Sequence, residues 1–96
     1  DWGDPYILIG NAYASGNKVC GNKFEQSAVF WAVVDKYLKA KNVDPSVEER
    51  ANELINRYSQ YFPNNEETFF QGLKDGDPYT IGCWINETTT VRTTKI

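Results

Sequence analysis

The 96-residue chain contains neither histidine nor methionine. Without histidine, the commonest general acid or base of enzymes is missing. A zinc site would also have too few strong ligands, because only two cysteines remain. The composition therefore excludes a zinc centre and favours a protein that is not an enzyme. The absence of methionine, together with Asp1 as first residue, predicts a piece cut from a longer protein.

The chain also lacks long apolar runs and a surplus of positive charge. A transmembrane helix needs roughly 18 or more consecutive apolar residues, and no such window or secretory leader is present. The formal net charge is -3, with the ten basic residues spread along the chain. No positive field is expected to attract phosphate groups, so nucleic acid is not an expected partner. No cofactor is expected either.

The cysteines, Cys20 and Cys83, lie far apart in the sequence. They can form a structural disulfide or stay as two free thiols, and the sequence leaves both possibilities open. A disulfide between them would persist in an oxidising compartment and would stabilise the fold by about 4 kcal/mol in the chain-entropy model.

Apolar residues at helical spacing predict four helices. The first spans about 5–14, with Asp4 as N-cap and Pro5 in its first turn. A loop rich in Gly, Asn and Lys follows at 15–23, and the second helix spans about 24–41. The third starts at 45–46, where Asp44 precedes Pro45 and a Ser46–Glu49 capping box is possible, and ends before residue 63. The fourth spans about 66–73, with a cap from residue 64 or 65.

After Pro78 the pattern changes from helical to extended. Tyr79, Ile81 and Cys83 alternate with smaller or polar residues, and threonines follow. The segment 79–96 is predicted either as two short strands joined at Asn86-Glu87 or as an extended tail over the helices. The sequence thus predicts one mainly α domain over 1–96, with a helical core at 1–62, a short helix and turn at 63–78, and this tail.

Residues 5–62 resemble a tetratricopeptide repeat and the start of the next one. In the first helix, the family's aromatic, leucine, glycine and tyrosine series corresponds to Tyr6, Ile9, Gly10 and Tyr13. In the second helix, its small residue, aromatic, alanine and closing proline correspond to Val33, Tyr37, Ala40 and Pro45. Ala51, Leu54, Ile55 and Tyr58 are similar to the first helix of a following repeat. The long 15–23 loop departs from the family, whose period is about 34 residues.

Nearly the whole chain also resembles the C-terminal region of larger tetratricopeptide repeat proteins that anaerobic gut bacteria export. This resemblance implies a non-enzymatic module for protein–protein interaction that ends an array of helices. It also implies an extracytoplasmic location, in the periplasm or envelope. The expected partner is another protein or a peptide, and the oligomeric state is left open.

First-helix residues of such repeats face the partner. The candidate binding residues are therefore polar or aromatic positions of the two first helices: Tyr6, Asn11, Asn52, Asn56 and Arg57. Asn56 and Arg57 are the strongest of these, because they lie between core positions and can hydrogen-bond an extended peptide.

Two other functions remain open at this stage. An envelope module that binds glycan or peptidoglycan would use exposed aromatics such as Trp84 and Tyr79, whose faces stack on sugar rings. A small hydrolase would depend on the two cysteines and scattered acids, and is the weakest alternative. Asp75-Gly76-Asp77-Pro78 offers carboxylates but has the composition of a turn that ends a helix rather than of a calcium loop.

Overall fold

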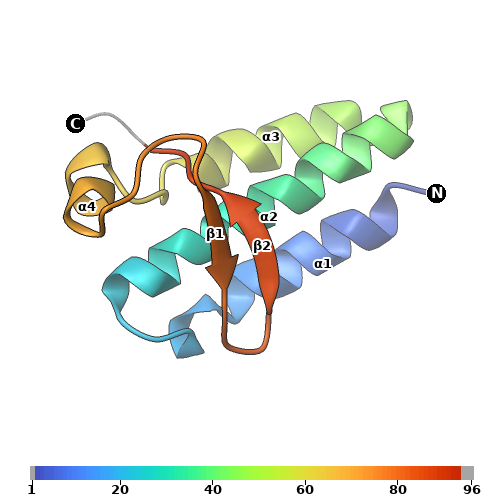
Figure 1. Cartoon of the computed structure of the whole chain (residues 1–96). Helices are drawn as coiled ribbons and strands as arrows, with labels where there is room; N and C mark the ends of the chain where they lie inside the picture. Colours follow the sequence, from blue (N-terminus) through green and yellow to red (C-terminus); the bar gives the residue numbers. More distant parts are fainter. Residues whose placement is uncertain (1, 94–96) are drawn as a thin grey trace.

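A computed structural model describes residues 2–93 of the chain. It is mainly helical with a small antiparallel hairpin, as the sequence predicts. The elements in chain order are α1 (Asp4–Ser15), η1 (Asn17–Val19), α2 (Lys23–Val43), η2 (Pro45–Val47), α3 (Glu48–Ser59), α4 (Asn65–Phe70), β1 (Pro78–Ile81) and β2 (Glu87–Thr90). Figure 1 shows α1, α2 and α3 side by side in alternating directions, with the hairpin crossing one face of this layer and α4 at one end.

The central helix, α2, supplies most of the core. It contacts α1, α3 and both strands, so apolar residues all around it are needed. Trp31, Val33, Tyr37 and Ala40 are each 0% exposed. Trp31 lies in the core, against Val91 of the segment that follows β2. A long helix without a polar face is stable here because other elements cover it on more than one side.

The start of α2 is fixed by side chains close to it in sequence. The side-chain oxygen of Asn22 accepts from the backbone N–H of Glu25, and the Glu25 carboxylate accepts from the backbone N–H of Asn22. This capping box satisfies two backbone donors at the start of α2. At its other end α2 stops at Asp44, whose carboxylate accepts from the backbone N–H of Ser46. This places the break between the helices where Asp44-Pro45 predicts it.

Two of the predicted caps are wrong. Asp4 is inside α1 rather than before it, and Gly3 at the cap position makes no side-chain bond; Asp4 instead pairs with Arg50 of α3. The Ser46–Glu49 capping box is also absent, because the Ser46 hydroxyl donates to Asp44 at 2.6 Å. The Asp4 carboxylate therefore binds a guanidinium instead of a backbone amide, and Asp44 takes both the hydroxyl and the backbone N–H of Ser46.

The third helix ends before residue 63, as predicted, whereas the fourth is shorter than predicted. α3 ends at Ser59, and residues 60–62 form a turn before Pro63. α4 ends at Phe70, since Gly72 takes a positive φ of 74° and the N–H of Leu73 returns to the carbonyl of Thr68. Its cap is Asn64, in a reciprocal box with Glu67.

The tail is a hairpin, with Tyr79 opposite Thr89 and Ile81 opposite Glu87. The predicted two-residue connection at Asn86-Glu87 is wrong, because Glu87 already belongs to β2 and the strands are joined by residues 82–86. Within that connection the N–H of Asn86 donates to the carbonyl of Gly82, and Cys83 and Asn86 both have a φ of 47°.

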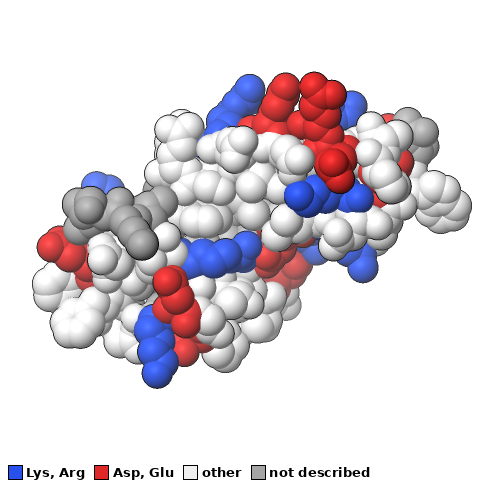
Figure 2. Space-filling model, turned by 90° about the horizontal axis from the view of Figure 1, so that it is seen from above, with Lys and Arg blue, Asp and Glu red and all other residues white. Residues whose placement is uncertain are grey.

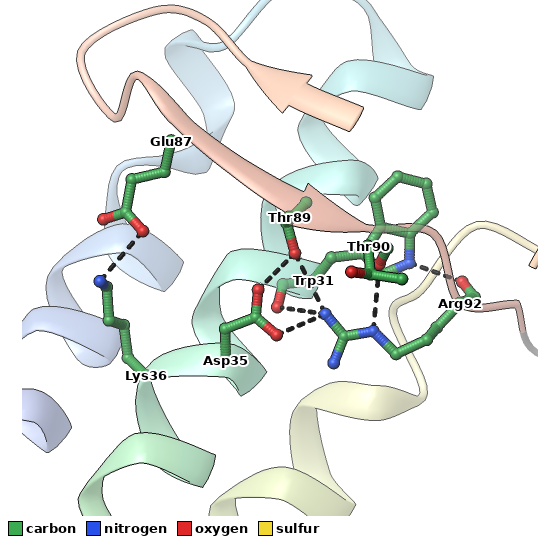
Figure 3. A network of polar contacts seen from close by, with 7 residues as sticks. All are labelled: Trp31, Asp35, Lys36, Glu87, Thr89, Thr90 and Arg92. Carbon is green, nitrogen blue, oxygen red and sulfur yellow. Dashed lines mark hydrogen bonds and ion pairs between the residues drawn. The ribbon is translucent and has the colours of Figure 1, made fainter. Parts of the chain in front are cut away.

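A network around Arg92 attaches the hairpin to α2 (Figure 3). The Arg92 guanidinium donates to Asp35 at 2.6 Å and to the carbonyl of Trp31 at 3.0 Å, and the Trp31 indole N–H donates back to the carbonyl of Arg92. Thr89 also donates to Asp35. These bonds satisfy the polar groups at the base of the hairpin, where strand and helix meet.

A second set of contacts attaches the other end of the hairpin. Cys20, after η1, forms a disulfide with Cys83 of the connection, with Cα atoms 5.3 Å apart. Glu87 pairs with Lys36 of α2 at 3.0 Å and accepts from the Tyr13 hydroxyl of α1. A two-stranded hairpin is marginal on its own, and these contacts give it the support that it needs.

Within residues 2–93, no helix is both long enough and apolar enough to cross a bilayer.

Candidate groove between α1 and α3

The candidate functional site is a groove of about 510 Å³ between α1 and α3. Ile7, Leu8 and Leu54 form its apolar lining. The polar lining comes from both helices: Asp4 and Asn11 from α1, and Arg50, Glu53 and Arg57 from α3. Both signs of charge therefore flank an apolar strip.

The groove exists because α1 and α3 both pack on α2, on either side of it, and are bridged by the Asp4–Arg50 ion pair. Gly10 sets how closely α1 approaches, since a Cβ at that position would lie 2.7 Å from the Tyr37 ring. The expected face of α1 is slightly rotated: Ile7 is buried, whereas Ile9, expected in the core, is 37% exposed.

Tyr37 links the core to the groove. Its hydroxyl donates to the side-chain oxygen of Asn11 at 2.6 Å. Burial, with a further contribution from the nearby Tyr58, raises the pKa of Tyr37 to about 12, while the Arg57 guanidinium acts in the opposite direction. The phenol therefore stays neutral at physiological pH and holds the oxygen of Asn11, which leaves the Asn11 amide N–H groups available to a ligand.

Arg57 and Arg50 differ although both line the groove. Arg50 is paired with Asp4 across the groove. Arg57 makes no ion pair or hydrogen bond with any residue of the described range 2–93. A guanidinium carries five N–H donors in a plane, so Arg57 offers the groove an unused charged donor.

The predicted site residues divide into two groups. Asn11 and Arg57 line the groove. Tyr6 packs partly buried against the core, Asn52 accepts from Lys41 of α2 at 2.8 Å, and Asn56 is exposed outside the groove.

Other lining residues were missed by the sequence analysis. Arg50, Glu53 and Leu54 precede Arg57 by seven, four and three positions. This is the spacing of one helix face, and it was the signal that could have identified them once Arg57 was chosen.

The two aromatics considered for glycan binding also separate. Tyr79 packs edge to face against Phe24 and Trp31, so its ring is part of the core. Trp84 is 49% exposed, with its indole N–H donating to the carbonyl of Gly16 at 3.2 Å and its ring edge to face with Tyr13.

A second hollow, of about 670 Å³, lies beside α4. Phe69 and Phe70 line it with 76% and 81% of their area exposed. It is larger than the α1–α3 groove, but none of the predicted binding residues lines it. Its polar lining residues belong to α4, the turn after it and Thr93. The α1–α3 groove is the better candidate because two helices converge on it with donors, acceptors and apolar side chains.

Two of the acids near this hollow already have partners. Asp77 accepts from the backbone N–H of Lys74, and Asp75 from the Thr93 hydroxyl. Among residues 2–93, no three carboxylate or sulfur side chains gather as metal ligands would. Because Cys20 and Cys83 are bonded to each other, neither is a thiol.

Comparison with known proteins returned no match among family models, curated proteins or solved structures.

Proposed function

We propose that the chain is a non-enzymatic interaction module, similar to tetratricopeptide repeats, that binds a segment of another polypeptide in the α1–α3 groove. The observation that carries this proposal is the convergence of free donors, Arg57 and the Asn11 amide, beside the apolar Leu8 and Leu54. An extended peptide presents backbone carbonyls and side chains at alternate positions, which suits such a lining.

Three further features support the comparison with these repeats. Gly10 lies against Tyr37, Ala40 is fully buried, and Pro45 begins the turn into α3. The disulfide supports an extracytoplasmic location, since such bonds persist in oxidising compartments and are rare in the cytosol. A role as the C-terminal end of a larger exported bacterial protein is part of this proposal.

The test is a selection from a random peptide library displayed on phage, with the immobilised chain as bait. Arg57→Glu should abolish retention of the selected peptides, because it reverses the unpaired charge in the groove. Asn56→Ala is the matched control, since Asn56 lies on the same helix and outside the groove; it should bind like the parent. Peptides retained equally by parent and Arg57→Glu would contradict the proposal.

A second candidate function is glycan or peptidoglycan binding through Trp84, favoured by its half-exposed indole. Affinity electrophoresis in gels that contain soluble cell-wall glycans tests it. Trp84→Ala should lose retardation while the melting temperature stays close to that of the parent. A large loss of melting temperature, or no retardation of the parent, would assign Trp84 a packing role against Tyr13 instead.

A further inference from the structure

The two strands of the hairpin pair with each other through alternate residues only. The N–H of Val91 donates to the carbonyl of Asp77 at 2.9 Å, in the same register as the strands. Hydrogen-bonded and non-hydrogen-bonded pairs alternate along an antiparallel ladder. Thr80 and Thr88, which lie opposite each other, are therefore a non-hydrogen-bonded pair. Their backbone N–H and C=O groups point away from the partner strand, towards the two outer edges of the hairpin.

The outer edge of β2 is open. Thr88 and Thr90 both present their backbone groups there, and both residues are exposed. Within residues 2–93, neither of their N–H groups donates to another group of the chain. Proteins commonly protect such an edge, because it is a template for another strand. Pro78, which has no N–H, protects the outer edge of β1 in this way, whereas the edge of β2 has no proline.

The helices α1 and α2 extend beyond the open edge of β2. Along α2, Trp31 contacts β1, and Asp35, one turn later, contacts β2. The helix then continues to Val43. Tyr13, near the end of α1, also contacts β2, and the preceding turns of α1 run beside the last turns of α2. Figure 1 shows both helices continuing past β2. A strand added at β2 would therefore lie over these two helices.

The helix surface beside this edge offers a cation and an apolar side chain. Lys39 is one turn after Asp35 and Lys36, which contact β2, and lies on the same face of α2. It is exposed and forms no ion pair within the described part of the chain. On α1, Ile9 lies one turn before Tyr13 and is 37% exposed. Both side chains are available to a strand that pairs with β2.

The surface over α3 is of a different kind. Figure 2, which looks down from the side on which α3 lies in Figure 1, shows acidic and basic side chains mixed. A partner on that side would have to match individual charges. The edge of β2 offers backbone groups instead, with which any extended segment can form hydrogen bonds. In such complexes backbone pairing supplies affinity, and alternate side chains supply specificity.

We infer that the edge of β2 binds an extended segment of another polypeptide as a third strand. Side chains of a strand alternate between its faces, so residues two positions apart would face the helices. An acidic side chain of the segment complements Lys39, and an apolar one packs on Ile9. A second copy paired antiparallel through its own β2 does not fit, because its hairpin lies on its own helices. Those helices would occupy the space of α1 and α2.

The test uses a defined probe, the peptide acetyl-Thr-Ile-Thr-Glu-Thr-Ile-Thr-amide, which alternates polar side chains with apolar and acidic ones. NMR spectra of the isotope-labelled, oxidised chain are recorded with about 10 μM to 1 mM probe. The amide signals of Thr88 and Thr90 should shift. Exchange of these two protons with solvent should slow at least about tenfold, because they become hydrogen-bonded. The amide of Thr80, on the other edge, should stay unchanged.

A pair of proline variants separates the two edges. Thr88→Pro removes an outward N–H of β2, so the dissociation constant for the probe should rise at least about tenfold. Thr80→Pro is the matched control, because it changes the other edge and loses the same contact between the two threonine hydroxyls. It should bind the probe like the parent. Lys39→Glu should weaken binding about threefold or more, because it opposes the acidic side chain of the probe.

Two N-methylated probes keep the inference testable should Thr88→Pro fail to fold. Methyl groups on alternate amides block one edge of the peptide and leave the other edge free. One of the two probes should therefore bind and the other should not. Equal binding of both, or no shift of Thr88 and Thr90 at the highest probe concentration, would overturn the inference. Shifts of these amides caused by raising the concentration of the chain alone would assign the edge to a second copy, and would overturn it too.

The inference goes beyond the α1–α3 groove and is tested separately from it. None of Lys39, Thr88 and Thr90 lines the groove. Arg57→Glu should therefore bind the probe like the parent, and Thr88→Pro should retain the peptides that the groove selects. Loss of probe binding in Arg57→Glu would place the probe in the groove and overturn the assignment to β2.

Discussion

The hairpin and α4 are two small elements that follow α3, yet they are attached to the body in different ways. The hairpin is joined to Cys20 by a disulfide. It is joined to α2 by two ion pairs and a hydrogen-bonded network. The hydrogen bonds of α4 are mainly local, in its Asn64–Glu67 box and around the buried Thr68. The hairpin buries Ile81 and Val91 beside it, whereas α4 leaves Phe69 and Phe70 in solvent.

This difference indicates which element belongs to the core. The hairpin covers the residues of α2 that α1 and α3 leave open, among them Trp31. α4 covers little of the core and, in the sequence, separates α3 from the hairpin. We therefore expect changes at the hairpin contacts to affect the stability of the whole domain, and changes on the outer side of α4 to leave it nearly unchanged.

The largest effect is expected from Cys20→Ser/Cys83→Ser. The disulfide spans a sequence separation of 63, and its loss should lower the free energy of unfolding by about 4 kcal/mol. Urea unfolding under oxidising conditions measures it. The reduced parent serves as control and should match the variant. Equal stability of variant and oxidised parent would mean that the remaining contacts alone hold the hairpin.

A smaller loss, of about 2 to 3 kcal/mol, is expected from Arg92→Ala. This variant leaves Asp35 and the Trp31 carbonyl without their charged donor, at a site that is only about one-third exposed. The matched control is Arg50→Ala, whose pair with Asp4 is more exposed, and which should cost at most about 1 kcal/mol. Similar losses in the two variants would show that the network stabilises no more than a surface pair does.

Alkaline pH should also loosen the hairpin. Burial, followed by the hydrogen bond to Glu87 and its charge, raises the pKa of Tyr13 to about 12. Because the raised pKa means that the fold favours the neutral phenol, this contribution is complete below the ordinary pKa of 10.0 and is lost as pH rises towards 12. Tyr37 adds to the same loss.

Absorbance of tyrosinate, recorded together with unfolding between pH 9 and 12, measures this effect. Glu87→Gln should lower the pKa of Tyr13 and leave that of Tyr37 unchanged. An unchanged tyrosine titration in this variant would contradict the assignment of the Glu87 contribution.

The smallest effect is expected from Phe69→Ser/Phe70→Ser on α4. Both rings are more than three-quarters exposed, so the free energy of unfolding should change by no more than about 0.5 kcal/mol. Thermal unfolding followed by circular dichroism measures it. A loss above about 1 kcal/mol would place α4 with the hairpin as part of the core and remove the contrast between them.

Much of the helical layer could be predicted because its signals are local. The break at Asp44-Pro45 and the apolar pattern of α2 around Tyr37 and Ala40 can be identified from neighbours in the sequence alone. One failure arises where a distant partner competes with a local one, because Arg50 takes Asp4 from its expected capping role. The choice between hairpin and tail stayed open because the residues that hold the hairpin, among them Asp35 and Cys20, lie far from it in the sequence.

The groove could be predicted in part for the same reason. Asn11 and Arg57 were expected there because each is a polar residue between apolar positions of a predicted helix. Asn52 and Asn56 do not line the groove, because the side of α3 that does so is set by how α3 rotates on α2, with Ala51 turned into the core. That rotation is set by how α3 packs on α2, so it cannot be predicted from the polar residues of α3 alone.

The disulfide makes the polypeptide a covalent ring that contains α2, α3, α4 and β1, with α1 and β2 as its two open arms. A single protease cut in the exposed stretch 74–76 would open this ring without releasing a fragment. The cut chain would migrate as one molecule on a gel until a reducing agent is added. A cut in this turn after α4 would thus leave the two arms connected through the Cys20–Cys83 disulfide.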